Sequence, residues 1–335
     1  MDVDRLFVIL GAGASHDGAT DTFVSQANRR PPLVSSLFHH DYFGILDDYP
    51  LAQDVAADLG PGGLAATSIE QFIRERYQGS THLPSKRKFN AIPPYLQELL
   101  WQCSRSFARS PDNYTRLISE VLELPETVFV TLNYDTLLDE RLSIYSPLQT
   151  LDHYIAHREP QWSLVKLHGS VNWGRALRGP ASFSFHEPPP EVQVDSEIVL
   201  TASPKAGLAE LRAQGTQTYF PALSVPVGQE DELVCPPAHV DFLSESLRTA
   251  QGLHLLVIGY SAYDQEVLRL IRDSGTTVAS LMVVNRGEDA CRDVLDRLRH
   301  ALGFNLPDVP HNYDSRGFTD FTLEGLRPYV DGLRP

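Results

Sequence analysis

Short apolar runs recur along the chain and predict the strands of a sheet. Each run holds four to six residues, and most are uninterrupted rather than alternating with polar positions. Uninterrupted runs are typical of parallel strands that helices cover on both faces. The predicted strands are Leu6–Leu10, Thr127–Leu132, Leu164–Leu167, Glu197–Thr201, Leu253–Ile258 and Leu281–Val284.

Helical periodicity fills most of the sequence between these runs. Ser68 and Asp264 each stand directly before such a pattern, as N-cap residues do. The alternation of strands and helices predicts an α/β fold with a Rossmann-like, doubly wound, mostly parallel sheet. The predicted helices are Ser68–Tyr77, Pro94–Ala108, Asn113–Leu124, Thr136–Ile144, Val240–Ala250, Asp264–Asp273, Asp289–Leu302 and Leu323–Leu333.

Two stretches do not follow this alternation. Residues from about 31 to about 125 are mainly helical in pattern and separate the first two strands, so we expect a helical insertion. Residues from about 173 to about 237 are rich in proline and indicate loops and irregular strands roofing a ligand site. We therefore expect residues 1–335 to form a single domain with these two additions.

Composition excludes several classes of function. The chain has 28 basic and 43 acidic residues and a formal charge of −15, which opposes direct nucleic-acid binding. The short basic run Ser85–Lys88 is expected to be a solvated loop. No apolar run is long enough for a membrane span. The three cysteines are scattered and form no zinc-type pair, so we expect no metal and a cytoplasmic location.

A glycine-rich turn follows the first predicted strand, in the sequence FVILGAGASHDG. Gly11 permits a tight turn, Gly13 allows a phosphate to approach the backbone, and the helix start offers free N–H groups to an anion. The spacing departs from the dinucleotide fingerprint because His16 stands where a third glycine is expected. A plain strand-to-helix connection stays open as an alternative.

Polar residues follow three further strands. Asn133 and Asp135 come after the second run, at the strand end where open α/β sheets bind ligands, although either is also a suitable helix cap. His168 closes the third run, either as a core histidine bonded to a carbonyl or as an acid–base group. Gly259 and Ser261 follow the fifth. Four such strand ends favour one shared ligand site.

The segments GAGAS, TLNYD, KLHGS and GYSAYD, in this order, resemble the NAD-binding domain of the sirtuin superfamily. They are most similar to the bacterial sirtuin-like NAD hydrolases of anti-phage defence. The resemblance covers Leu6–Gly18, Val128–Glu140, Ser163–Trp173 and Leu253–Asn285, and is weaker in PPLVSSLF and SIEQFI.

The resemblance implies a role for each matching residue. NAD would be the substrate, with Asn133 orienting the attacking water, Asp135 facing the carboxamide pocket and His168 acting as the base. Ser261 and Asn285 would contact the adenosine ribose beside Gly259. The pyrophosphate and nearby ribose would be held by Gly11, Ala12, Gly13, Ala14 and Ser15.

The sequence departs from the sirtuin deacylases at one point. Those enzymes carry two cysteine pairs for zinc after the His-Gly segment, and this chain has none there. We therefore expect hydrolysis of NAD to nicotinamide and ADP-ribose, with deacylation and a non-catalytic NAD or ADP-ribose sensor as alternatives. Control of such an activity predicts a homo-oligomer or a complex with a separately encoded ATPase or Argonaute-like protein.

Overall fold

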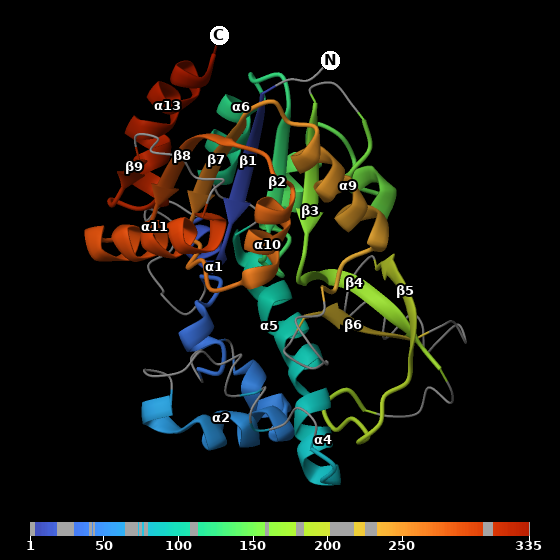
Figure 1. The fold of residues 1–335 in the computed structure, drawn as a ribbon. Helices are drawn as coiled ribbons and strands as arrows, with labels where there is room; N and C mark the ends of the chain where they lie inside the picture. Colours follow the sequence, from blue (N-terminus) through green and yellow to red (C-terminus); the bar gives the residue numbers. More distant parts are fainter. Residues whose placement is uncertain are drawn as a thin grey trace.

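The computed structural model contains two sheets and a separate group of helices (Figure 1). The strands of the larger sheet all run in one direction and end toward the helices α2, α4 and α5. The structure describes residues 4–18, 30–39, 42, 44–63, 73, 76, 80–107, 113–157, 161–178, 184–201, 218–224, 233–303 and 311–334.

The larger sheet has six parallel strands in the order β3-β2-β1-β7-β8-β9. The chain first builds outward from β1 in one direction and then returns to the other side of β1, which is the strand order of doubly wound dinucleotide-binding folds. The predicted fold class is therefore confirmed. The strands are β1 (Arg5–Leu10), β2 (Thr127–Thr131), β3 (Trp162–Lys166), β7 (Leu253–Ile258), β8 (Val278–Val284) and β9 (His311–Asp314).

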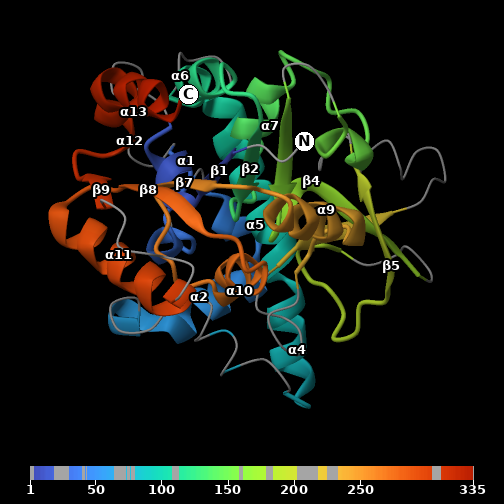
Figure 2. The same ribbon diagram turned by 45° about the horizontal axis from the view of Figure 1, so that its top comes forward.

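Helices cover both faces of this sheet (Figure 2). Alternate side chains of β1 enter opposite cores: Val8 packs in one, and Phe7 and Ile9 pack in the other. The first core includes residues of α6 (Asn113–Val121), α7 (Leu137–Leu142), η4 (Leu151–Tyr154), α12 (Phe318–Asp320), η6 (Phe321–Gly325) and α13 (Leu326–Leu333). The second includes residues of α9 (Pro237–Arg248), α10 (Gln265–Asp273) and α11 (Glu288–Leu302).

The helices between β1 and β2 divide between two cores. One group, together with neighbouring loop residues, forms a third core of its own, and α6 instead packs against the sheet through Leu117 and Ile118. The group comprises η2 (Val34–Ser36), η3 (Ile45–Asp48), α2 (Pro50–Gly63), α4 (Leu83–Asn90) and α5 (Ile92–Phe107). The third core supports the expectation that these helices form an insertion. That the whole chain is a single domain stays a prediction.

The smaller sheet is antiparallel, in the order β5-β4-β6. Its strands are β4 (Gly169–Leu177), β5 (Val194–Leu200) and β6 (Tyr219–Leu223). The run Glu197–Thr201 was expected in the main sheet, and this expectation is wrong. Only Ile198 of β5 is fully buried, so the apolar run belongs to a half-exposed strand rather than to one covered on both faces.

Gly169 connects the two sheets. It has a φ of +84°, and a Cβ there would lie 2.0 Å from the carbonyl oxygen of Ala222 in β6. Only glycine fits both the conformation and the contact. His168 therefore lies in the turn between the end of β3 and the start of β4.

Several smaller expectations are also settled. Asp264 is the N-cap of α10, as predicted, because its side chain accepts a hydrogen bond from the Val267 amide. The basic run Ser85–Lys88 is part of α4 rather than a loop. The predicted helix Ser68–Tyr77 lies outside the described residues except at Ile73 and Arg76. In the described ranges, no helix combines the length and apolar character of a membrane span.

Candidate functional site at the carboxyl ends of the parallel strands

Three glycines bring the turn after β1 against the turn after β7. A Cβ on Gly11 would lie 2.5 Å from the carbonyl oxygen of Gly259, and one on Gly13 would lie 2.8 Å from the Gly259 Cα. Gly259 has a φ of +59°, and its own Cβ would lie 2.1 Å from the Ala14 nitrogen. The contact lies between β1 and β7, where the strand order reverses and where such sheets bind ligands.

The amides of the glycine-rich turn are mostly used within the protein. Gly11 donates to the carbonyl of Ile258, Gly13 donates to Gly259, and Ala14 donates to Gly11. The amides of Gly11, Gly13 and Ala14 therefore already have acceptors within the protein, and an anion site at the helix start stays a prediction. The glycines are required by backbone packing against the β7 turn, and their contact with a ligand stays a prediction, as it does for Ala12.

Asn133 follows β2 and joins this strand end to the glycine-rich turn. Its side-chain amide donates to the Gly11 carbonyl and to the Ser15 hydroxyl, each at 2.9 Å. A carbonyl acceptor fixes which side-chain atom is nitrogen, because only the amide donates. The carboxamide oxygen of Asn133 has no hydrogen-bond partner among the described residues. It is the atom through which this side chain can hold a ligand or a water.

Ser15 is almost completely buried, and its hydroxyl lies within this inner network. It is 2.8 Å from the hydroxyl of Tyr114, in addition to the contact with Asn133. The structure therefore places Ser15 beneath the site, where it supports Asn133. A direct contact between Ser15 and a nucleotide remains a prediction.

Asp135 and Lys166 are buried beside these residues, and Nζ of Lys166 donates a hydrogen bond to the Asp135 carbonyl. Asp135 accepts a hydrogen bond from the Leu137 amide at 3.1 Å, one of the bonds that the helix-cap alternative predicted, although Thr136 is the N-cap residue of α7. Burial raises its pKa, although Lys166, Ser15 and the Leu137 amide act in the opposite direction. Lys166 is fully buried, and its Nζ lies 2.9 Å from Oδ2 of Asp139. This buried ion pair fixes the positions of β3 and the segment after β2.

His168 is held by a carboxylate from a different part of the chain. Its Nε2 lies 2.7 Å from Oδ2 of Asp264, and the two side chains are 18% and 19% exposed. The ring of Tyr134 stacks on the imidazole, with centroids 6.2 Å apart. Nδ1 of His168 has no hydrogen-bond partner in the part of the chain that the structure describes. The histidine is thus not a core residue bonded to a carbonyl.

The strand register brings Asn133 and His168 to the same edge. Thr131 of β2 pairs with Lys166 of β3, and each of the two polar residues stands two positions beyond its member of this pair. Backbone amides also connect the two segments, since Val171 donates to the Tyr134 carbonyl. The second and third strand ends therefore meet, as their positions in the sequence predicted.

The remaining predicted contacts lie around the β7 turn. Asn285, after β8, donates its side-chain amide to the Tyr260 carbonyl at 3.3 Å. Ser261 is exposed, and its carbonyl accepts a hydrogen bond from Arg297. Both residues stand at the correct edge of the sheet for a nucleotide, and their contact with the adenosine ribose stays a prediction.

Sequence reasoning missed the partnership of Asp264 with His168. Asp264 was recognised as an N-cap, which accounts for Oδ1 and its bond from the Val267 amide at 3.1 Å. The second oxygen, Oδ2, faces His168 instead. A carboxylate at the β7 strand end and a histidine at the β3 strand end are visible in the sequence, but nothing in their spacing pairs them.

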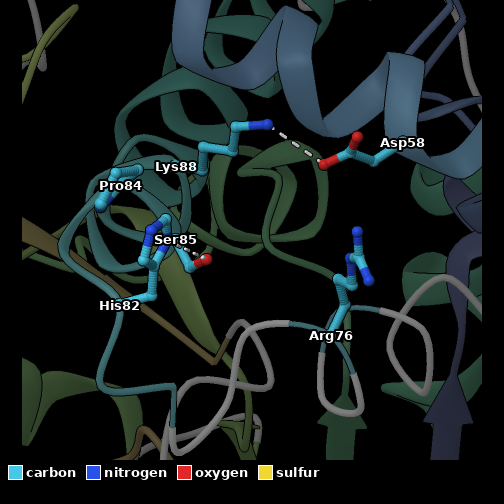
Figure 3. Close-up of a pocket in the computed structure, with 6 residues that line it drawn as sticks. All are labelled: Asp58, Arg76, His82, Pro84, Ser85 and Lys88. Carbon is cyan, nitrogen blue, oxygen red and sulfur yellow. Dashed lines mark hydrogen bonds and ion pairs between the residues drawn. The ribbon is translucent and has the colours of Figure 1, made fainter.

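The thiols and a cavity beside helix α4 lie outside this chemistry. Burial raises the pKa of Cys103 and of Cys235 to about 12, so neither supplies a thiolate at neutral pH. A cavity of about 410 Å³ opens between α2 and α4, where Lys88 faces Asp58 (Figure 3). None of the residues that line it belongs to the strand-end site, and its lysine is already paired with Asp58 and Asp54.

The fold and the site define an α/β protein with polar side chains at its topological switch point. Residues 127–289, just under half of the chain, match the model of the SIR2-like domain. The match includes Asn133, His168 and Asn285 and excludes the glycine-rich turn. No curated protein matches the chain significantly.

Solved structures of Sir2 homologues are similar to the chain over nearly its full length. A Sir2 homolog in complex with NAD is 14% identical, with 98% of this chain and 90% of that chain covered and a TM-score of 0.39. A mutant Sir2 homologue with ADP-ribose is 14% identical, with coverage of 99% and 94% and a TM-score of 0.42. A further Sir2 enzyme is 14% identical, with the same coverage and a TM-score of 0.43.

Proposed function

We propose that the protein is an NAD hydrolase that cleaves NAD to nicotinamide and ADP-ribose. One observation carries the proposal: two side chains at the same sheet edge are each anchored through one polar atom and leave an acceptor atom for a ligand. These atoms are the carboxamide oxygen of Asn133 and Nδ1 of His168. The strand order and the SIR2-like match, which is consistent with an NAD-dependent chemistry, support the same substrate.

The chemistry suits two acceptors. Cleavage of the bond between the nicotinamide nitrogen and ribose C1′ builds oxocarbenium-like charge on the sugar, and the bond electrons return to the pyridinium ring, so nicotinamide leaves neutral. The leaving group therefore needs no acid. A water adds to C1′ while Asn133 accepts one of its hydrogen bonds and His168 accepts its proton. The products are nicotinamide, ADP-ribose and the proton.

The choice of hydrolysis over deacylation rests on this chain's own residues. The three cysteines lie at 103, 235 and 291, each buried and on a different element or loop, and the segment after His168 forms β4 of an antiparallel sheet. A deacylase consumes NAD only together with an acyl-lysine peptide, whereas a hydrolase needs water alone. A sensor without turnover is the second alternative.

The test is NAD consumption by the purified chain, with and without an acetyl-lysine peptide, and with nicotinamide and ADP-ribose identified as products. We expect turnover without peptide, and a fall of at least about 100-fold for Asn133→Ala and for His168→Ala. His300→Ala, an exposed histidine on α11, is the matched control and should match the wild type. Turnover that requires the peptide would favour the deacylase, and NAD binding without turnover would favour the sensor.

We further propose that the activity serves anti-phage defence and is controlled by assembly, as a homo-oligomer or with a separately encoded ATPase or Argonaute-like protein. An enzyme that consumes cellular NAD must be silent until needed. The assembly part is tested by measuring mass in solution together with NAD turnover. A monomer that is fully active alone would contradict it.

A further inference from the structure

We propose that Asp264 is the positioning residue of His168, holding the imidazole as its Nε2–H tautomer so that Nδ1 is the proton acceptor. The inference rests on the proposed function for the use of that acceptor. Asp264 is the N-cap of α10, after β7, and lies on the opposite side of the switch point from β3, the strand that His168 follows.

The first argument is that the carboxylate does more than cap a helix. Oδ1 of Asp264 accepts the Val267 amide at 3.1 Å, which completes the N-cap of α10. Oδ2 lies 2.7 Å from Nε2 of His168, the length of a charge-assisted hydrogen bond. A helix cap needs only one carboxylate oxygen. The contact of Oδ2 with His168 is therefore a second role of Asp264.

The second argument concerns the proton. Burial alone raises the pKa of Asp264, but the hydrogen bond and charge of His168 and the amides of Val267 and Glu266 lower it below its usual value. The carboxylate is therefore ionised at neutral pH and only accepts. A neutral imidazole facing it must carry its proton on Nε2, which leaves the lone pair on Nδ1.

The third argument is that the loop carrying Asp264 is fixed by its surroundings. The Tyr260 hydroxyl donates to the Asp264 carbonyl at 2.9 Å, and Arg297 donates to the Ser261 carbonyl at 2.8 Å. Ala262 has a φ of +55°, a conformation that costs a residue with a side chain roughly 1–2 kcal/mol. Local strain that the neighbouring contacts maintain is a common feature of functional loops.

The other side of the imidazole is fixed as well. Tyr134 stacks on the ring and donates its hydroxyl to the Ser224 carbonyl at 2.7 Å, while the Ser224 amide donates to the His168 carbonyl. Among the described residues, Asp264 is hydrogen-bonded to the ring and Tyr134 stacks on it. The orientation of His168 is thus set by residues that follow β2 and β6 and by the N-cap residue of α10.

The experiment compares Asp264→Asn with the wild type. An asparagine keeps the shape and can still cap Val267, but its amide donates to Nε2 and favours the Nδ1–H tautomer. We expect kcat to fall roughly 10- to 100-fold with little change in KM for NAD. We also expect a different pH profile, because the carboxylate that faces the imidazole is lost.

A matched control and a second readout keep the outcomes separate. Asp273→Asn makes the same chemical change at the exposed end of α10 and should leave both kcat and the pH profile unchanged. Long-range ¹H–¹⁵N spectra of the imidazoles, with His168 assigned by its loss in His168→Gln, report the tautomer without any need for turnover. We expect Nε2–H in the wild type and Nδ1–H in Asp264→Asn.

Each result bears on one proposal. If the wild type hydrolyses NAD and Asp264→Asn has the same kcat and pH profile, the positioning role is wrong and the proposed function stands. If the wild type has no activity, the proposed function fails, and the tautomer decides this inference. If His168 of the wild type carries its proton on Nδ1, the positioning role of Asp264 is wrong. If it carries the proton on Nε2 and Asp264→Asn moves the proton to Nδ1, the positioning role is supported.

Discussion

The two halves of the strand-end site are built by different means. Between β1 and β7, the backbones of Gly11, Gly13 and Gly259 pack directly against one another. Between β2 and β3, side chains such as Lys166 and His168 are held by ion pairs and hydrogen bonds. The first half depends on the absence of side chains, and the second depends on the partners of each polar group.

Because of this difference, we expect different kinds of substitution to destabilise the two halves of the site. In the backbone half, an added methyl group displaces main chain, which has little freedom to move. In the side-chain half, removing one partner leaves another buried group without compensation. Asn133 joins the halves, because it belongs to the β2 end and donates to Gly11.

The largest effect is expected from Gly259→Ala. Its Cβ would lie 2.1 Å from the Ala14 nitrogen, in a residue whose φ is +59°. We expect a loss of more than about 4 kcal/mol in the free energy of unfolding, measured by urea denaturation. Gly275→Ala is the matched control, because its φ is +71° but nothing lies within 4 Å of the added atom. It should cost only about 1 kcal/mol. Equal losses would show that conformation, rather than packing, makes Gly259 necessary.

A smaller loss is expected from Lys166→Met. The substitution leaves the Asp139 carboxylate buried with the Tyr154 hydroxyl but without its cation. We expect about 3–4 kcal/mol of lost stability, again by urea denaturation. The double variant Lys166→Met with Asp139→Leu removes both charges and should recover much of the loss. If the double variant is as unstable as the single one, lost packing rather than the unpaired charge accounts for the destabilisation.

The smallest of the three effects is expected from Asn133→Asp. A carboxylate oxygen then faces the Gly11 carbonyl where an amide donated. We expect a loss of about 1–3 kcal/mol at pH 7. Repulsion raises the pKa of the new carboxyl in the folded state, so the deficit grows as the pH rises through that value and shrinks on acidification. Thermal unfolding from pH 4.5 to 7.5 tests this. Asn133→Ala, which lacks the charge, should show a deficit independent of pH.

Much of the main sheet could be predicted from the sequence. The expected strand Leu253–Ile258 has the observed bounds, and Leu6–Leu10 differs from β1 by one residue. Parallel strands buried on both faces leave a strong local signal. The run at Glu197–Thr201 carries the same signal but lies in the antiparallel sheet, because burial on one face and on both faces cannot be separated over five residues.

The candidate site was predictable only in its location. Residues after β1, β2, β3 and β7 were expected to meet, and their common edge follows from parallel strand direction alone. Which groups face one another did not follow. The close packing of Gly13 against Gly259, for example, was not predicted. Asp264 was expected to cap a helix and to lie at one of these strand ends, but its pairing with His168 was not predicted.

The sequence by itself determined the sheet class and the edge at which polar residues gather, because strand burial and strand ends are recorded in local patterns. It also determined which residue types were present there. The tertiary structure decided how they pair: His168 and Asp264 stand 96 positions apart, and Gly11 and Gly259 come from strands joined by most of the chain. Contacts of that kind depend on the order and register of the strands, which no local stretch of sequence contains.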